Sequence, residues 1–169
     1  MISNTRRWPP RSSSLHFAAC FALVGLAVGG YVSWSAIGDG WAFFFVYSST
    51  AAFVTGFGLW RWRVERRQTT GCRVGLFTGA LAGLLSHLLC WWLFILGAWL
   101  DHSWLTGGAS QGEPPMNPLQ GIIGAIVFSL FSLALFGWLT IPAGALIGCW
   151  MLRTAGSRSG IGSECDVRQ

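Results

Sequence analysis

Lysine is absent from this chain, and charged residues of every kind are few. Only 10% of its 169 residues are Asp, Glu, Lys or Arg, whereas soluble domains carry about 25%. Hydrophobic residues make up 53% of the chain, so too few charges remain to coat a globular core with a water-facing surface. These absences exclude an ordinary soluble domain and favour a protein that is embedded in a lipid bilayer.

Four long apolar segments contain no Asp, Glu, Lys or Arg. A helix needs about 20 such residues to cross the hydrocarbon core of a bilayer. The sequence therefore predicts an all-α membrane protein, an antiparallel bundle of four transmembrane helices in one domain. The domain covers residues 15–152, and its predicted spans are 15–37, 41–60, 74–100 and 119–152.

The eleven basic residues are all arginines, and in a four-span chain they all fall on one side. They lie in the two tails and in the connection 61–73 between the second and third spans. The two other connections carry acidic residues instead: Asp39, Asp101 and Glu113. Because cytoplasmic loops are enriched in Arg, we expect both termini in the cytoplasm and a bacterial inner membrane as the location. The basic tails, 1–14 and 154–169, are predicted to be disordered.

The first apolar segment could also be a cleaved signal peptide, since it follows a basic stretch. Its apolar run is longer than the usual 7–15 residues, and Trp34 stands where small residues would precede a cleavage site. We therefore expect it to be retained as a span.

Small residues four positions apart recur inside the predicted spans. Helices in lipid associate through close backbone approach, which glycine permits. We expect these glycines to pack helices within the chain, although the same pattern also suits a dimerisation face. They are Gly25, Gly29, Gly75, Gly79, Gly83, Gly144 and Gly148.

The fourth span is longer than a bilayer requires. A straight helix over 119–152 would extend about 50 Å, against a hydrocarbon core of about 30 Å. Pro142 removes one backbone hydrogen bond and crowds the carbonyl of Trp138, so we expect a kink near Pro142. Such a kink could act as a hinge or be purely structural.

The cysteines show no C-x-x-C spacing, which argues against a thiol oxidoreductase or a zinc site. Cys72 and Cys165 fall on the cytoplasmic side of the predicted topology, and Cys20, Cys90 and Cys149 fall within spans. Since disulfides form in oxidising compartments, we predict none in this chain.

His87 is the only imidazole deep within a predicted span, where a polar group needs a partner and is often functional. Hydroxyl groups at a similar depth are Ser48, Ser49, Thr50, Ser129 and Ser132. The candidate intramembrane polar site is therefore His87 with Ser48, Ser49 and Ser132. A structural hydrogen bond between helices is the favoured interpretation, and a proton relay or a ligand contact is the alternative.

Three tryptophans, Trp91, Trp92 and Trp138, lie deeper than an interfacial belt requires. They could line a site for a flat or cationic ligand, or they could face lipid and fill gaps between helices.

Catalytic and cofactor chemistry finds little support. His16, His87 and His102 lie at different depths, which argues against a haem held by two imidazoles. Asp101, His102 and Glu113 are metal-ligand types, but their loop has no evident scaffold. Phosphate-binding, zinc-protease and nucleophile-elbow motifs are missing. We expect no catalytic residue, no cofactor and no metal.

Three classes of function remain. The favoured class is a non-catalytic accessory or interaction protein of assembly, regulatory or immunity type. The alternative is a small oligomeric carrier or channel for a small solute, for which only His87 could serve as a titratable group on the pathway. A redox or lipid-modifying enzyme is the third. Expected partners are the lipid bilayer and another membrane protein or a second copy; nucleic acid is not expected, since the arginines flank apolar runs.

Overall fold

The computed structural model describes residues 13–36, 41–68, 71–105 and 115–161, and all regular secondary structure within them is helical. The α-helices are α1 (Ser13–Ser35), α2 (Phe44–Trp60), α3 (Cys72–Leu100), α4 (Gly121–Ser132) and α5 (Trp138–Ile161). Three π-helical segments extend or join them: η1 (Arg61–Glu65), η2 (Asp101–Leu105) and η3 (Leu133–Gly137). Because these segments continue the α-helices without a break, the described residues form four helical rods: α1, α2 with η1, α3 with η2, and α4 with η3 and α5.

Three of these rods are long and apolar enough to cross a membrane. They cover Ser13–Ser35, Cys72–Trp104 and Gly121–Thr154, while α2, with 17 residues, is shorter. Large apolar side chains such as Leu23, Phe77 and Leu130 point outward, each more than half exposed. The all-α part of the prediction is thus confirmed for the described residues, and three of the predicted spans have the length and composition to cross a membrane.

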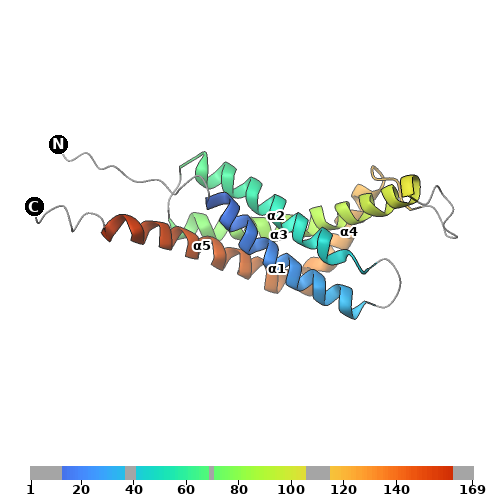
Figure 1. Cartoon of the computed structure of the whole chain (residues 1–169), viewed down its shortest axis with the longest axis horizontal. Helices are drawn as coiled ribbons and strands as arrows, with labels where there is room; N and C mark the ends of the chain where they lie inside the picture. Colours follow the sequence, from blue (N-terminus) through green and yellow to red (C-terminus); the bar gives the residue numbers. More distant parts are fainter. Residues whose placement is uncertain (1–12, 37–40, 69–70, 106–114, 162–169) are drawn as a thin grey trace, which may run out of the picture.

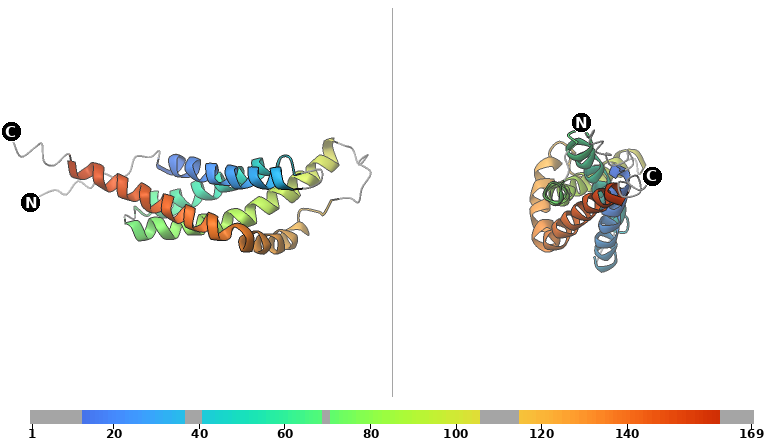
Figure 2. Two further views of the ribbon diagram at one scale, coloured as in Figure 1. Left: turned by 90° about the horizontal axis from the view of Figure 1, so that it is seen from below. Right: turned by 90° about the vertical axis from the view of Figure 1, so that its left-hand side faces the viewer.

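Consecutive rods run in opposite directions (Figure 1). The start of α1, the end of α2, the start of α3 and the end of α5 therefore lie at the same end of the molecule. We call this the arginine end, because η1, the residues after it, the first turn of α3 and the last turns of α5 carry Arg61, Arg63, Arg66, Arg67, Arg73 and Arg153. α1 packs mainly on α2 and α3 mainly on α5. At the opposite end α1 and α4 diverge, as Figure 2 shows.

Glycines bring α1 and α2 together. Gly25 and Gly29 lie one turn apart on α1, and both face α2. A Cβ added at Gly25 would lie 2.7 Å from the backbone oxygen of Ser48, and one added at Gly29 would lie 2.8 Å from the Cα of Phe45. Any side chain at these two positions would therefore push the helices apart.

The α3–α5 contact is closer still. Gly75 lies against Gly148, and Gly79 lies against Gly144, so that backbone meets backbone over two turns. Gly83 continues the contact, since its added Cβ would come within 3.0 Å of the α5 backbone. Together with Gly25 and Gly29, every glycine of the predicted packing motifs thus lies at a helix contact within the chain.

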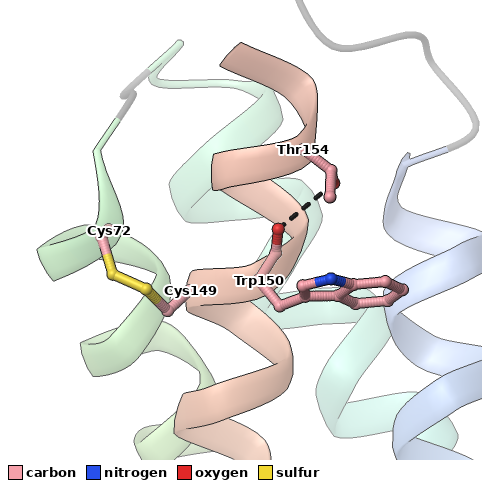
Figure 3. Close-up of a disulfide and its surroundings, with 4 residues drawn as sticks. All are labelled: Cys72, Cys149, Trp150 and Thr154. Atoms are coloured by element: carbon pink, nitrogen blue, oxygen red, sulfur yellow. Dashed lines mark hydrogen bonds between the residues drawn. A yellow bond between two sulfur atoms is a disulfide. The ribbon is translucent and has the colours of Figure 1, made fainter. Parts of the chain in front are cut away.

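A disulfide between Cys72 and Cys149 crosses the same contact (Figure 3). The prediction that the chain has no disulfides is wrong. That prediction used only the redox compartment of each cysteine, whereas the pairing follows from distance. Because Gly75 and Gly148 bring α3 and α5 into backbone contact, the Cα atoms of Cys72 and Cys149 lie 4.5 Å apart, within the range that a disulfide spans.

A carboxylate caps α1 at the arginine end. Glu65 Oε1 accepts hydrogen bonds from the Ser13 hydroxyl and from the backbone N–H of Ser14, both at 2.9 Å. The indole N–H of Trp60 donates to the same hydroxyl at 3.2 Å, and the Trp60 ring stacks on Phe17 with 4.3 Å between centroids. The first N–H groups of a helix lack partners inside the helix and attract negative charge, so Glu65 anchors α1 to the end of α2.

Helices extend further than the sequence predicts at several boundaries. Ser13 and Ser14 belong to α1, and residues 61–65 and 101–105, expected in connections, are π-helical. The helix α5 continues to Ile161, through residues 154–161 that were expected to be a disordered tail. Residues 1–12 and 162–169 of the predicted tails lie outside the described residues.

The fourth rod changes direction between α4 and α5, as both views of Figure 2 show. Pro142 lies inside α5, and the irregular segment is η3, which ends just before Trp138. Pro142 has no N–H to give the Trp138 carbonyl, and the π-helical turn directly precedes Trp138. Two backbone carbonyls of η3 accept hydrogen bonds from side chains of α5. The Trp138 indole N–H donates to the carbonyl of Leu135 at 2.7 Å, and the Thr140 hydroxyl donates to the carbonyl of Phe136 at 3.1 Å.

Candidate functional site

A cleft of about 500 Å³ lies between α1, α2, α3 and the fourth rod, where α1 and α4 diverge. Its wall on α1 includes Val24, Gly25 and Val28, and its wall on the fourth rod includes Phe131 and Phe136. None of the residues that line the cleft is Asp, Glu, Lys or Arg. The volume falls within the range of about 300–1,000 Å³ that small-molecule sites occupy.

His87 projects from α3 into the wall of this cleft and is 7% exposed. Its Nδ1 lies 2.6 Å from the Ser132 hydroxyl, and its Nε2 lies 2.8 Å from the Thr140 hydroxyl. Ser132 is the last residue of α4 and Thr140 lies in the first turn of α5, so the imidazole bridges the bend of the fourth rod from the side. Of the hydroxyl groups that the sequence suggested, only Ser132 meets His87, and Thr140 was missed.

The hydrogen-bond chain assigns the tautomer of His87. Thr140 donates its only hydroxyl proton to the carbonyl of Phe136 at 3.1 Å, and it can therefore only accept from the imidazole. Nε2 must then carry the proton, and Nδ1 accepts from the Ser132 hydroxyl. Every polar atom of the neutral imidazole is satisfied, so the arrangement holds helices together and leaves no spare donor or acceptor on His87.

The π-helical segment η3 lies between the two hydroxyl-bearing residues that reach His87. Ser132 and Thr140 are eight positions apart, whereas two turns of a regular α-helix take about 7.2 residues, so a regular helix would turn them away from each other. The wider turns of a π-helix take up the extra residue. The hydroxyls of Ser132 and Thr140 consequently reach the two nitrogens of one imidazole.

The other suggested hydroxyls bond to backbone carbonyls rather than to His87. Ser48 lines the cleft and donates to Gly25 at 2.8 Å, across the α1–α2 contact. Ser49 donates to Val46 within its own helix at 3.1 Å. Ser86, also at the cleft, donates to Gly83 at 2.8 Å. The hydroxyl groups at the cleft are therefore already paired within the protein.

Aromatic rings form the wall of the cleft nearest the end opposite the arginines. Trp41, Phe44, Trp91 and Phe128 all line it. Trp91 stacks on Phe128 with 5.0 Å between centroids, and it meets Trp41 edge-on at 6.1 Å. Phe44 lies 5.6 Å from Trp91. These spacings are typical of favourable aromatic pairs, so the rings pack against one another along this wall.

Trp91, Trp92 and Trp138, the three tryptophans predicted to lie deep in the spans, have different surroundings. Trp91 lines the cleft, and Trp92 lines a separate groove on the other side of α3 beside Leu88 and Ile126. Trp138 is 72% exposed on the outside of the fourth rod. Only Trp91 can therefore contribute to a ligand site in the cleft.

The indole N–H of Trp91 is buried and has no hydrogen-bond partner among the described residues. An indole nitrogen can only donate, and a buried donor without an acceptor costs about 1–3 kcal/mol. The rings around Trp91 belong to Trp41, Phe44, Phe94 and Phe128, none of which offers a side-chain oxygen. This orphan donor was not anticipated from the sequence, which does not show how an indole is surrounded.

The chemistry that this cleft supports is binding. No set of three His, Cys, Asp or Glu side chains that could hold a metal ion occurs among the described residues. Cys90 is buried beside His87 on the same wall, where no arginine or helix N-terminus is at hand to activate a thiol. No family model, curated protein or solved structure matches this chain.

Proposed function

We propose that this chain is a non-catalytic accessory protein of a bacterial inner membrane, and that it works by holding an uncharged apolar molecule in the cleft. The cleft carries the proposal, because it has the volume of a ligand site and no charged residue in its lining. The pairing of His87, Ser48 and Ser86 within the protein argues for binding rather than catalysis.

The proposed membrane arrangement is a four-helix bundle with four spans and both termini in the cytoplasm. Its fourth span is α2, whose 17 residues fall at the lower limit of about 17–25 for a transmembrane helix. The crowding of arginine at one end of the bundle supports this orientation. Reporter fusions after His102 and after Arg153 test it. We expect the first reporter to be active outside the cytoplasm and the second within it, and the reverse pattern would refute the orientation.

The disulfide gives this orientation a further consequence. On the proposed orientation the Cys72–Cys149 bond lies at the cytoplasmic end, where thiols are generally kept reduced, so the fraction of molecules that carry this bond in growing cells tests the orientation. Thiol labelling after an acid quench measures the two states. A bond that is complete in untreated cells would place the arginine end in an oxidising compartment and contradict the proposed orientation.

The ligand itself can be sought by native mass spectrometry of the chain, extracted gently from its host membrane. The cleft variant is Val24→Phe, and its matched control is Leu23→Phe, the adjacent residue, which is 64% exposed and does not line the cleft. We expect a bound small molecule on the wild type and on Leu23→Phe, and its loss from Val24→Phe. A wild-type protein that carries no ligand would refute the proposal.

The second candidate is a small oligomeric carrier. The bend at η3 favours it, because π-helical turns often mark functional sites and both Leu135 and Phe136 of η3 line the cleft. A homo-oligomer in the same mass spectra, without a second polypeptide, would favour the carrier. A stable complex with another membrane protein would favour the accessory protein.

A further inference from the structure

We infer that the arginine end carries a binding site separate from the cleft, and that this site takes the phosphate headgroup of an anionic phospholipid. The site is the exposed side of η1 and of the residues that follow it, and we call it the η1 face. Its members are Arg61, Trp62, Arg66 and Arg67. The inference goes beyond the proposed ligand of the cleft. It requires only that the arginine end lies at a membrane surface, on either side of the bilayer.

The π-helical register of η1 brings two arginines together. The backbone N–H of Arg66 donates to the carbonyl of Arg61 at 2.9 Å, five positions back along the chain. In a regular α-helix residues four apart are neighbours, so Glu65 would lie beside Arg61 and offset its charge. In η1 the wider turn places Arg66 one turn above Arg61. Glu65 turns instead to the start of α1, where it accepts hydrogen bonds from Ser13 and Ser14.

The same register pairs the other two members of the η1 face. The Arg67 guanidinium lies over the Trp62 ring, again five positions back, with 4.9 Å from its Cζ to the ring centroid. All four members are exposed, whereas Val64 between them is buried. Three guanidinium groups and one indole therefore share the exposed side of one short segment.

Charge selects an anion as the ligand. The carboxylates among the described residues are Glu65, which is held at the start of α1, and Asp101, which lies at the opposite end in η2. The η1 face itself carries three positive charges and no negative charge. A guanidinium presents N–H donors in a planar fork that matches phosphate oxygens, so a phosphate group suits this face.

The surroundings select a lipid over a soluble phosphate. Trp62 is 48% exposed, and Trp150 on α5 is 61% exposed; exposed tryptophans are typical of the level where headgroups meet hydrocarbon. Below this level the rings of α2 continue the site. Arg61 lies over the Phe57 ring, 5.7 Å from its centroid, and Phe57 stacks with Phe53 at 6.3 Å. An acyl chain can lie along these two rings while its phosphate meets the arginines.

Nuclear magnetic resonance of the full-length protein in zwitterionic detergent micelles tests the inference, with nitrogen-15 in the tryptophan indoles. Substitution of Trp62 by Phe assigns the Trp62 N–H resonance. Three probes are titrated separately: dimyristoyl phosphatidylglycerol, dimyristoyl phosphatidylcholine and glycerol 3-phosphate. The two lipids share their acyl chains and differ in net charge, and glycerol 3-phosphate has the phosphate without the chains.

We expect phosphatidylglycerol to shift the Trp62 resonance saturably, and the other two probes to give no saturable shift over the same concentrations. Arg66→Gln should weaken phosphatidylglycerol binding about fivefold, the usual effect of one arginine at an anionic membrane surface. Arg153→Gln is the matched control, because it removes the same charge from an exposed arginine on α5. Binding at Trp62 should be unchanged in Arg153→Gln.

Every other outcome overturns the inference. No shift of the Trp62 resonance with phosphatidylglycerol, or equal binding of the two lipids, would show that the η1 face does not recognise an anionic headgroup. Saturation by glycerol 3-phosphate at the same concentrations would show a site for a soluble phosphate. Equal weakening by Arg66→Gln and Arg153→Gln would show a general effect of net charge. None of these outcomes bears on the cleft, whose ligand is tested by Val24→Phe.

Discussion

Replacing Gly79 with Ala should weaken the protein by forcing α3 away from α5. The added Cβ would meet the backbone of Gly144 and Ala145. Backbone atoms cannot rotate out of the way as the end of a flexible side chain can, so the helices must separate or bend. Overpacking of this kind typically costs about 1–3 kcal/mol.

A second effect of the same substitution has the opposite sign. Alanine is the better helix former, by up to about 1 kcal/mol relative to glycine. Gly58→Ala on α2 isolates this effect, because nothing lies within 4 Å of the position of its Cβ. Both variants gain stability from the higher helix propensity of alanine, but only Gly79→Ala also loses stability through the clash of its Cβ with the backbone of α5. We therefore expect Gly79→Ala to be less stable than Gly58→Ala by about 1–3 kcal/mol.

Reversible unfolding in bicelles, monitored by tryptophan fluorescence, measures this difference in stability. The Cys72–Cys149 disulfide is reduced beforehand, so that it does not hold α3 against α5 and hide the effect of the substitution. A second readout is the rate at which reduced Cys72 and Cys149 join under mild oxidant, which should fall in Gly79→Ala and stay unchanged in Gly58→Ala. If Gly79→Ala is as stable as Gly58→Ala and oxidises at the wild-type rate, the backbone contact between α3 and α5 is not as described.

Three further predictions follow from other contacts. In the oxidised protein, Cys149→Ser removes a link between residues 77 positions apart. It should lower stability by at most about 4.5 kcal/mol on the chain-entropy model; equal stability with and without reductant in the wild type would contradict this. Glu65→Gln keeps an acceptor for the Ser14 N–H but loses the negative charge at the start of α1, so we expect the free energy of unfolding to fall by about 0.3–1 kcal/mol. This loss is measurable as a lower thermal midpoint, and an unchanged midpoint would show that the carboxylate charge is unimportant. Nitrogen-15 spectra of His87 should show a neutral ring protonated at Nε2, and a signal from a ring protonated at Nδ1 alone would refute the assigned hydrogen-bond chain.

The class of this protein was predictable because lipid leaves the backbone few options. An apolar run without charges, long enough to cross the bilayer, must pair its own backbone groups, and an α-helix does so within one segment. Leu23 and Phe77 could therefore be assigned to helices from composition alone. The exact helix ends were not predictable, because capping by Glu65 and the π-helical extensions depend on contacts outside each run.

The candidate site was predictable only in part. His87 stood out because a polar group deep in a span needs a partner, and Ser132 was among the partners considered. Thr140 was missed, because the candidate hydroxyls were chosen by their depth in the span, and Thr140 lies eight positions beyond Ser132. The surroundings of Trp91 include the rings of Trp41, Phe44 and Phe128 from two other parts of the chain, which no local pattern contains.

By itself the sequence determined that the chain is helical, with segments long and apolar enough to cross a membrane, and it marked the glycines at which helices could approach. Only the tertiary structure decided which helix each glycine meets, that Cys72 pairs with Cys149, and that a cleft opens where α1 and α4 diverge. The physical reason is that hydrophobicity and helical periodicity are local properties of a segment, whereas the choice of neighbour depends on how the surfaces of distant segments fit together.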